Sequence, residues 1–360
     1  MRSTSSARSA RCFRPPRRAA CRCSPRGCRR CRPRRRDSPM DVLRDPTPSS
    51  DLPRGGVVTI GNFDGVHVGH RMLLAGAVER ARALGVPAVA LTFEPHPEKV
   101  LRPGSGLRLV TTRAQKTQLL ARLGLDTLVE IGFDRRFAAI TAQEFAREFL
   151  FRRLAPAEVR LGTNFRFGAG RLGDVNFLST LGHEMGFRVI GVEPLEDGGE
   201  VVSSTRVRHE IARGHVDEAW RLLARPFYVD GRVYRGKRFG RQLGFPTINV
   251  DVENELLPAH GVYVTVLHIP SYSRVFASVT NIGVRPTVYE NSQVTVECHV
   301  LNFTGDVYDE PVRLSFLRRV RDERVFGSSM DLVAQIRRDV QTAELYFAQA
   351  GLPADELVRR

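Results

Sequence analysis

The sequence lacks long apolar runs, and it has very few cysteines outside its first 40 residues. No stretch of the 360 residues approaches the roughly 18 consecutive apolar residues that indicate a membrane helix. Five of the six cysteines lie in the first 40 residues, so the rest of the chain contains only Cys298. A single cysteine excludes an internal disulfide in that part and suits a reducing compartment. We therefore expect a cytoplasmic protein with no membrane segment.

Acidic residues are nearly absent from the first 40 positions. This segment has 14 arginines, one acid (Asp37) and no lysine, so it supplies +13 of the formal net charge of +16. The remaining residues are close to neutral, so no nucleic-acid partner is expected for them. Residues 1–50 are interpreted as a disordered Arg/Cys-rich tail. A presequence, or translation from a start codon upstream of Met40, is an alternative.

Two sequence patterns divide the rest of the chain. Over residues 55–222, short runs that are apolar at every position alternate with helical patterns, which indicates a parallel α/β sheet covered on both faces. Over residues 225–352, β-rich segments punctuated by Gly, Pro and Asn precede a helical pattern over 330–349. This second pattern predicts a small antiparallel β-barrel with a C-terminal helix. The fold class is therefore α/β plus β, in two domains.

The segment "GNFDGVHVGH", residues 61–70, follows the first apolar run. A glycine-rich turn from a strand into a helix leaves backbone N–H groups free at the positive end of the helix dipole, and this favours phosphate binding. His67 and His70 are spaced to face one side of the first helical turn. Two imidazole donors there can stabilise charge that builds on a phosphorus atom. Metal binding or simple helix capping is the alternative for this pair.

The pattern GxFDGxHxGH resembles the signature of nucleotidylyltransferases with a Rossmann-like fold. Together with "TFEPHP", "GTNFRFG" and "SSTRVR", it resembles the bacterial bifunctional riboflavin kinase/FMN adenylyltransferase family, also called FAD synthetases. The resemblance implies that His67 and His70 are catalytic and contact the ATP phosphates. The ATP contacts that it implies are Gly61, Asn62, Phe63, Gly65, Gly69, Ser204, Thr205 and Arg208. The flavin contacts that it implies are Pro95, Pro97, Asn164 and Phe165. Taken alone, "SSTRVR" predicts only a helix N-cap.

A second glycine pattern suggests a different function. Gly168, Gly170 and Gly173 match GxGxxG, and Glu193 follows 20 residues later. This is the dinucleotide-binding fingerprint of an NAD-dependent oxidoreductase. The fingerprint places its first glycine in the tight turn that ends a strand, whereas "TNFRF" separates Gly168 from the preceding apolar run. We therefore keep this function only as a remote alternative.

The second domain opens with a glycine-rich stretch, residues 231–250. Its Gly and Lys spacing imitates a P-loop, but Arg238 stands where Ser or Thr must hold Mg²⁺, so a P-loop is rejected. A glycine-rich loop with Lys237, Arg238 and Arg241 still suits a polyphosphate. Thr247 and Asn249 alternate along the next strand and therefore face the same side.

This stretch resembles the riboflavin kinase signature GxxLGFPTxN, and "GVYV", "NIGVRPT" and "VECHVL" continue the match. The resemblance implies that Thr247 and Asn249 bind Mg²⁺, and that Glu297 is the general base for the flavin 5′-hydroxyl. The further contacts that it implies are Gly236, Gly240 and Arg241 to ATP and Arg321 to the flavin or a phosphate. Without the resemblance, Glu297 fits an acid on an exposed strand face equally well.

The expected function is a two-step synthesis of flavin cofactors. ATP phosphorylates riboflavin to FMN in the second domain, and a second ATP adenylylates FMN to FAD in the first, with Mg²⁺ in both steps. The alternatives are an enzyme with only one of the two activities, the NAD-dependent oxidoreductase, and a nucleic-acid-binding regulator acting through the arginine tail. Whether the chain forms a homo-oligomer is left open.

Overall fold

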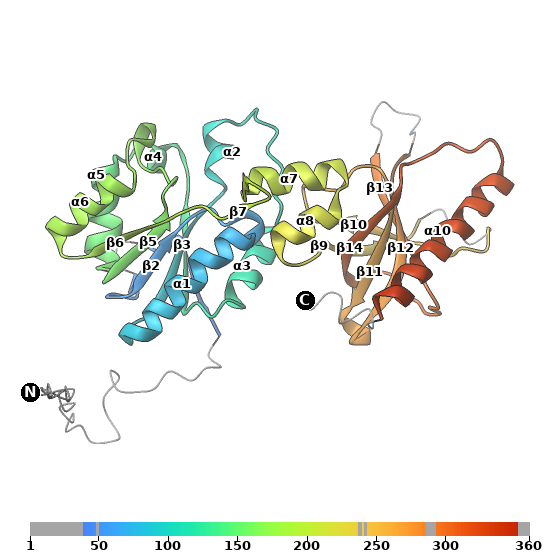
Figure 1. Ribbon diagram of the computed structural model, residues 1–360, viewed down its shortest axis with the longest axis horizontal. Helices are drawn as coiled ribbons and strands as arrows, with labels where there is room; N and C mark the ends of the chain where they lie inside the picture. Colours follow the sequence, from blue (N-terminus) through green and yellow to red (C-terminus); the bar gives the residue numbers. More distant parts are fainter. Residues whose placement is uncertain (1–38, 48–49, 237–239, 241–242, 286–292, 352–360) are drawn as a thin grey trace, which may run out of the picture. The chain divides into compact units, whose positions relative to one another are not determined.

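A computed structural model describes residues 39–47, 50–236, 240, 243–285 and 293–351. Over these residues the chain forms a parallel sheet with helices, then a closed antiparallel barrel, then a long helix (Figure 1). The predicted fold class is confirmed.

The sheet has strand order β1-β4-β3-β2-β5-β6, and all its neighbouring strands run parallel. Its strands are β1 (Asp41–Arg44), β2 (Val57–Ile60), β3 (Ala88–Glu94), β4 (Thr127–Gly132), β5 (Glu158–Gly162) and β6 (Arg188–Val192). The chain passes from β2 to β3 on one side and returns to the other side of β2 as β5, so the strand order reverses at β2. Ligands of such sheets bind at the carboxyl ends of the strands, next to this reversal.

Helices cover both faces of the sheet, as its apolar strands require. One face packs against α1 (Val68–Leu84) and α3 (Arg113–Ala121), and the other packs against η3 (Phe145–Leu154) and α6 (Val175–Met185). The alternation of a strand assigns neighbouring residues to opposite faces, so Val57 joins the first cluster while Val58 joins the second. The π-helix η3 continues the single turn α5 (Ala142–Glu144).

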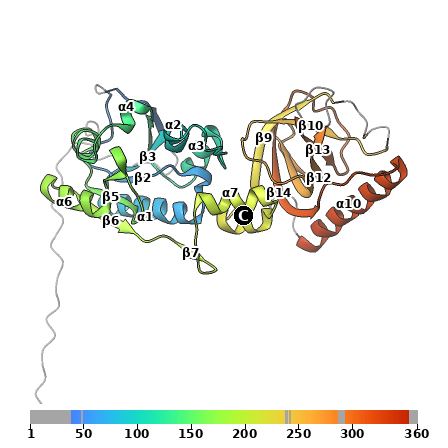
Figure 2. The same ribbon diagram turned by 90° about the horizontal axis from the view of Figure 1, so that it is seen from above.

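The barrel closes in the order β10-β13-β12-β11-β14-β9, with every pair antiparallel. Its strands are β9 (Phe227–Tyr234), β10 (Ile248–Val252), β11 (Gly261–Ile269), β12 (Arg274–Arg285), β13 (Gln293–Val300) and β14 (Pro311–Arg321). Helix α10 (Ser329–Ala350) lies along the outside of the barrel, where Ala343 packs against valines of β11 (Figure 2). Cys298 is buried as a free thiol.

Several short elements complete the fold. They are η2 (Asp64–Val66), α2 (Pro97–Leu101), α4 (Arg135–Ala138), η4 (Ala169–Arg171), β7 (Glu196–Asp197), β8 (Glu200–Val201), α7 (Ser204–Arg213), α8 (Val216–Leu223) and η5 (Pro270–Tyr272). The sequence patterns do not predict α2 or α4, because one helical turn is too short to show a hydrophobic period.

One predicted boundary is wrong. The tail was expected to extend over residues 1–50, but β1 lies within that range and pairs parallel with β4 from Asp41↔Thr127 to Arg44↔Glu130. A four-residue strand followed closely by Pro46 shows too little alternation to be recognised from sequence. Ordered structure therefore begins before residue 50.

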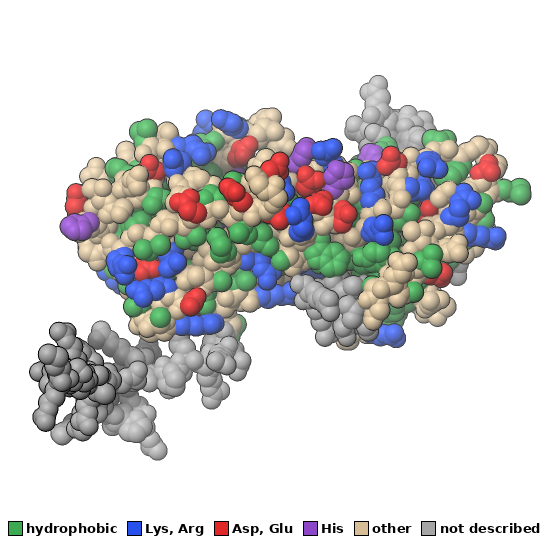
Figure 3. Space-filling model, in the orientation of Figure 1, with side chains coloured by type: hydrophobic (Ala, Val, Ile, Leu, Met, Phe, Trp, Pro, Cys, Tyr) green, Lys and Arg blue, Asp and Glu red, His purple; other side chains and the backbone are tan. Residues whose placement is uncertain are grey.

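Charges of both signs are interspersed on the face of the molecule that Figure 3 shows, in keeping with the near-neutral composition of the chain after residue 40. Across the ranges that the structure describes, no helix is long and apolar enough to cross a membrane.

Candidate active sites

The glycine-rich turn after β2 is built from left-handed backbone positions. Phe63, Gly65 and Val66 have φ values of 51°, 78° and 42°. At Gly65 a side chain would be strained by this φ and would also lie 3.2 Å from Val110. The turn leads directly into α1, so free backbone N–H groups and the positive helix end meet at the carboxyl edge of the sheet.

The two predicted imidazoles lie against each other at the start of α1. Their ring centroids are 3.6 Å apart and the rings are nearly parallel, at 19°. His67 is the N-cap, and its Nδ1 accepts a hydrogen bond from the backbone N–H of His70 at 3.3 Å. Because Nδ1 is an acceptor, a neutral His67 carries its proton on Nε2, where it can be donated to a ligand.

Both imidazoles are held in the neutral form. Burial, together with the positive charges of Arg225 and Arg208, lowers the pKa of His67 to about 4. Burial, followed by the neighbouring His67, also lowers the pKa of His70. At neutral pH the pair is therefore a set of uncharged hydrogen-bond donors.

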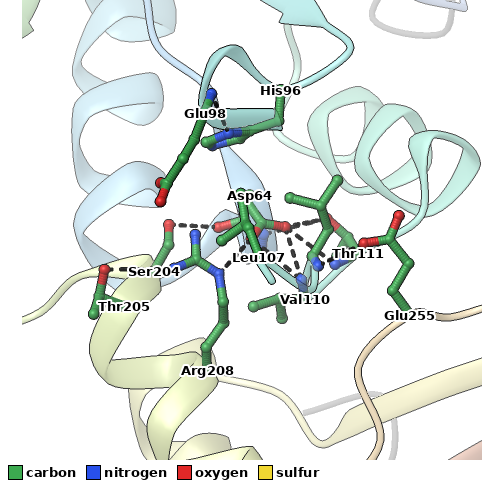
Figure 4. A network of polar contacts seen from close by, with 12 residues as sticks. Asp64, His96, Glu98, Leu107, Val110, Thr111, Ser204, Thr205, Arg208 and Glu255 are labelled. Carbon is green, nitrogen blue, oxygen red and sulfur yellow. Dashed lines mark hydrogen bonds and ion pairs between the residues drawn. The ribbon is translucent and has the colours of Figure 1, made fainter. Parts of the chain in front are cut away.

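Asp64 organises the groups around this turn (Figure 4). Its buried carboxylate accepts hydrogen bonds from the backbone N–H groups of Val110 at 3.0 Å and Thr111 at 3.1 Å. The Nε of Arg208 lies 3.3 Å from the same carboxylate. The hydroxyl of Ser204 donates to the backbone oxygen of Asp64 at 2.9 Å. The acid thereby joins the turn, the loop before α3 and helix α7.

The "SSTRVR" segment caps helix α7, as predicted from the segment alone, while its ATP contacts stay a prediction. Ser203 is the N-cap of α7, since its side chain accepts from the backbone N–H of Arg206. The next turn of the helix directs Ser204 and Arg208 toward Asp64, while Arg208 also donates to the hydroxyl of Thr205 at 3.4 Å. The predicted Ser204, Thr205 and Arg208 therefore lie together beside the histidine turn.

A cavity of about 630 Å³ opens at the carboxyl ends of β3 and β4. It is lined by Asp45, Glu94, Pro95, Gly132, Phe133, Asp134, Arg136, Phe137 and Ile140. Of the predicted flavin contacts, Pro95 lines this cavity. Pro97 begins α2, Asn164 is exposed after β5, and Phe165 stacks on Phe167 with centroids 5.9 Å apart. Pro97, Asn164 and Phe165 are not among the lining residues.

The second site lies on the barrel. Asn249 of β10 is directly opposite Glu297 of β13, and it is buried, with 5% of its surface exposed. A Cβ added to Gly236 would lie 2.2 Å from the amide nitrogen of Asn249, and one added to Gly240 would lie 3.1 Å from the hydroxyl of Thr247. Glycine at both positions therefore lets backbone approach the two predicted metal ligands closely. Lys237, Arg238 and Arg241 lie outside the described residues.

The donor set at this site suits Mg²⁺. Thr247 and Asn249 offer a hydroxyl and an amide oxygen, and Mg²⁺ prefers oxygen ligands while keeping several positions for water and substrate phosphates. Within the described ranges, no group of three or more His, Cys, Asp or Glu side chains could hold a metal ion.

Comparison with known proteins identifies the family. Residues 49–206 match the family model for FAD synthetase, and residues 223–347 match that for riboflavin kinase. The chain is 39% identical over 310 residues to the bifunctional riboflavin kinase/FMN adenylyltransferase of Escherichia coli (strain K12), covering 86% of this chain and 98% of the relative. This chain belongs to the bifunctional riboflavin kinase/FMN adenylyltransferase family.

Other comparisons agree with this family. The relative of the same name from Pseudomonas fluorescens is 40% identical over 299 residues, which are 83% of this chain and 95% of the relative. A crystal structure from Streptococcus pneumoniae, described as a macrolide-efflux protein, has a TM-score of 0.78 and 29% identity. It covers 85% of this chain and 99% of that chain, so the two share their fold over both parts.

The GxGxxG pattern does not form a dinucleotide-binding turn in this member of the family. Gly168 lies after the loop that follows β5, and Phe167 forms an isolated bridge with Gly173. A Cβ added to Gly173 would lie 2.7 Å from Ala142 and 2.8 Å from Phe167, so close packing accounts for this glycine. The oxidoreductase alternative is therefore wrong.

Arg321, predicted to contact the flavin or a phosphate, pairs with α10 in the structure. Its Nε and Nη2 donate to the carboxylate of Asp339 at 3.1 and 2.8 Å, and its Nη1 donates to the backbone oxygen of Asp322. Asp339 is buried and also accepts from Gln335 at 2.8 Å. The structure thus gives Arg321 a role in holding α10, and a ligand contact stays a prediction.

Sequence reasoning missed Asp64, His96 and Arg225 at the first site. Asp64 lies within the histidine motif, and an acid inside a glycine-rich turn is itself a signal of local hydrogen bonding. His96 accepts from the backbone N–H of Glu98 at 3.2 Å, and burial lowers its pKa. Arg225 lies after α8, far along the chain from the motif, and no local pattern marks it.

Proposed function

We propose that this chain catalyses both reactions of its family. In the barrel, ATP phosphorylates riboflavin to FMN with release of ADP. In the sheet domain, a second ATP adenylylates FMN to FAD with release of pyrophosphate. The observation that supports this proposal is the presence of two differently built sites, a pair of neutral imidazoles on a phosphate-type turn and a carboxylate opposite an amide ligand.

In the adenylylation step, a phosphate oxygen of FMN attacks the α-phosphorus of ATP, and the bond to pyrophosphate breaks. The backbone N–H groups at the start of α1 and the Nε2–H of His67 would donate to oxygens that gain charge in the transition state. His70, stacked on His67, would add a second donor. Because both rings are neutral at neutral pH, each offers one N–H donor.

In the kinase step, the 5′-hydroxyl of riboflavin attacks the γ-phosphorus of ATP while its proton passes to Glu297. Thr247 and Asn249 would hold Mg²⁺, which would neutralise charge on the phosphate oxygens. The backbone at Gly236 and Gly240, which lies close to these two ligands, would cover the polyphosphate.

The remaining assignments follow from these two reactions. We propose that the cavity lined by Pro95 receives the flavin ring of FMN, because Phe133 and Phe137 offer it apolar surfaces. The sheet domain would extend over residues 55–222 and the kinase domain over 225–352. Cys298, the one cysteine among the described residues, is a free thiol, which suits a cytoplasmic location.

Two incubations test the proposal. The full chain is mixed with ATP, Mg²⁺ and either riboflavin or FMN, and the flavins are separated by chromatography over time. From riboflavin, FMN is expected to appear first and FAD later. FMN without FAD would indicate a kinase only, FAD from supplied FMN but not from riboflavin would indicate an adenylyltransferase only, and neither product would contradict the proposal.

A further inference from the structure

Arg225 is a buried cation that lies between α8 and β9. Only 9% of its surface is exposed. It falls inside residues 223–347, the part of the chain that matches riboflavin kinase. Its guanidinium nevertheless contacts the other site, because Nη2 donates to the backbone oxygen of Gly65 at 2.8 Å. A residue of the kinase match thus contacts the phosphate-type turn of the sheet domain.

No described carboxylate lies within ion-pair distance of Arg225. Arg225 also donates to the backbone oxygen of Leu223 at 3.4 Å, and its guanidinium carbon lies 5.7 Å from the ring centre of Tyr228. The side chain of Tyr228 interacts with the guanidinium but is not a counter-charge, because a phenol is neutral at neutral pH. The Nε of Arg225 is buried and has no hydrogen-bond partner among the residues that the structure describes. Burial lowers the pKa of Arg225 to about 10, so it remains a cation at neutral pH. A buried cation without a counter-charge is destabilising, and an anion bound nearby offsets that cost.

The contact to Gly65 controls the turn that carries the imidazoles. Gly65 has its N–H held by the hydroxyl of Thr111 at 3.2 Å and its carbonyl held by Arg225. The left-handed positions at Gly65 and Val66 then bring the chain to His67. Because both polar groups of this glycine are held, the backbone enters α1 in a fixed direction. The N–H groups at the start of α1 and the imidazole of His67 are therefore held in a fixed direction as well.

We propose that Arg225 is a positioning residue of the adenylyltransferase site, supplied by the kinase part of the chain. It fixes the turn before His67 and adds an uncompensated positive charge beneath the groups that receive the ATP phosphates. This inference rests on the proposed adenylylation activity. It means that the two catalytic parts are not independent along the chain, because one contributes a residue to the site of the other.

The pKa of His67 gives a readout of the charge of Arg225 that a change in packing alone would not produce. The charged groups that act on His67 are Arg225 and Arg208 of α7, and His67 in turn lowers the pKa of the stacked His70 of α1. Arg225 in turn is influenced by Arg71, Tyr228 and Arg313. Since the cation of Arg225 lowers the pKa of His67, removing the charge should raise that pKa and extend protonation of His67 to higher pH.

The test compares Arg225→Gln and Arg225→Lys in the full chain, with Arg221→Gln as the matched control. Arg221 is an exposed arginine of α8 that pairs with Glu218 and Asp197, away from the histidine turn's own contacts. FMN adenylylation and riboflavin phosphorylation are measured separately as functions of pH. Arg225→Gln should lower kcat/KM for adenylylation on the order of tenfold to hundredfold and move its acid limb to higher pH.

The lysine variant separates charge from geometry. Arg225→Lys keeps the cation but not the planar fork, so adenylylation should fall only severalfold and the acid limb should stay in place. Riboflavin phosphorylation should match the unmodified chain in both variants, which shows that they fold. Arg221→Gln should leave both activities unchanged.

Three results would overturn the inference. Adenylylation could be unchanged in Arg225→Gln, both activities could fall together, or the Gln and Lys variants could lose adenylylation equally with no movement of the acid limb. If Arg225→Gln does not fold, the Arg225→Lys variant is the test. A selective loss of adenylylation in that variant would support the inference, and no loss would overturn it. Absence of adenylylation from the unmodified chain would instead count against the proposed function.

Discussion

Asn249 and Glu297 lie directly opposite each other on the antiparallel strands β10 and β13, and Glu297 also lies opposite Asn281 on β12. Residues opposite each other in a sheet project to the same face, so this register places one carboxylate between two amides. The closed barrel fixes all three strands. A proton acceptor is thereby held beside a predicted magnesium ligand, as attack of a hydroxyl on ATP requires.

Glu297→Gln should abolish most of the kinase activity and leave adenylylation intact. The amide keeps the shape of the side chain but cannot accept the proton of the 5′-hydroxyl, so a loss of about 10²- to 10⁴-fold is expected. Riboflavin phosphorylation and adenylylation of supplied FMN are measured separately. Glu344→Gln on the exposed side of α10 is the control. An unchanged phosphorylation rate would remove Glu297 as the base.

His70→Ala should reduce adenylylation and leave the kinase activity intact. Removing this ring takes away one donor and the stacking surface of His67, whose centroid lies 3.6 Å away. FMN should therefore accumulate from riboflavin while FAD formation falls by about 10²-fold or more. Chromatography of the flavins distinguishes the products, and His183→Ala on the exposed surface of α6 is the control. Equal loss of both activities would contradict separate sites.

Gly236→Ala should impair the kinase through a single methyl group. The added Cβ would lie 2.2 Å from the amide nitrogen of Asn249, so either the loop or the predicted magnesium ligand must move. The KM for Mg·ATP in riboflavin phosphorylation should rise, while adenylylation stays normal. Gly327→Ala is the matched control, because nothing lies within 4 Å of its Cβ position. Identical kinetics in the two variants would show that the close approach has no functional role.

The buried His67 should make stability depend on pH. In the unfolded chain this imidazole takes up a proton below pH 6.5, but in the folded chain it does so only near pH 4. Between these values the unfolded state binds more protons, so stability should fall as pH falls, in total by about 3 kcal/mol. Denaturant unfolding across this range measures the slope. His67→Gln should reduce it, and an undiminished slope in that variant would contradict the assignment.

The sequence contains enough information for the fold class because its two patterns differ in kind. Runs such as residues 57–60, which are buried at every position, are explained by packing between two helical layers, and the β-rich segments after Pro226 form the barrel. β1 could not be recognised, since a four-residue strand has no measurable period and is specified by its pairing with β4.

The candidate sites were predictable only where their residues belong to local motifs. His67 and His70 lie three residues apart, and the first helical turn alone brings them together. Asp64 gains its role from the loop at Val110 and from Arg208 on α7, which approach it through tertiary packing. Arg225 approaches the turn only because α8 and β9 direct it there. No local spacing contains that information.

Asp64→Asn should destabilise the sheet domain and reduce adenylylation together. The buried carboxylate accepts from the backbone of Val110 and Thr111 and pairs with Arg208. An amide could keep its oxygen toward the N–H groups of Val110 and Thr111, but its own N–H groups would then face Arg208, which would lose its counter-charge. Breaking a buried pair in this way costs about 3–5 kcal/mol. Thermal unfolding and FMN adenylylation are measured beside Asp217→Asn, an exposed acid of α8. If the two variants unfold at the same temperature, Asp64 does not hold the turn, the loop and α7 together.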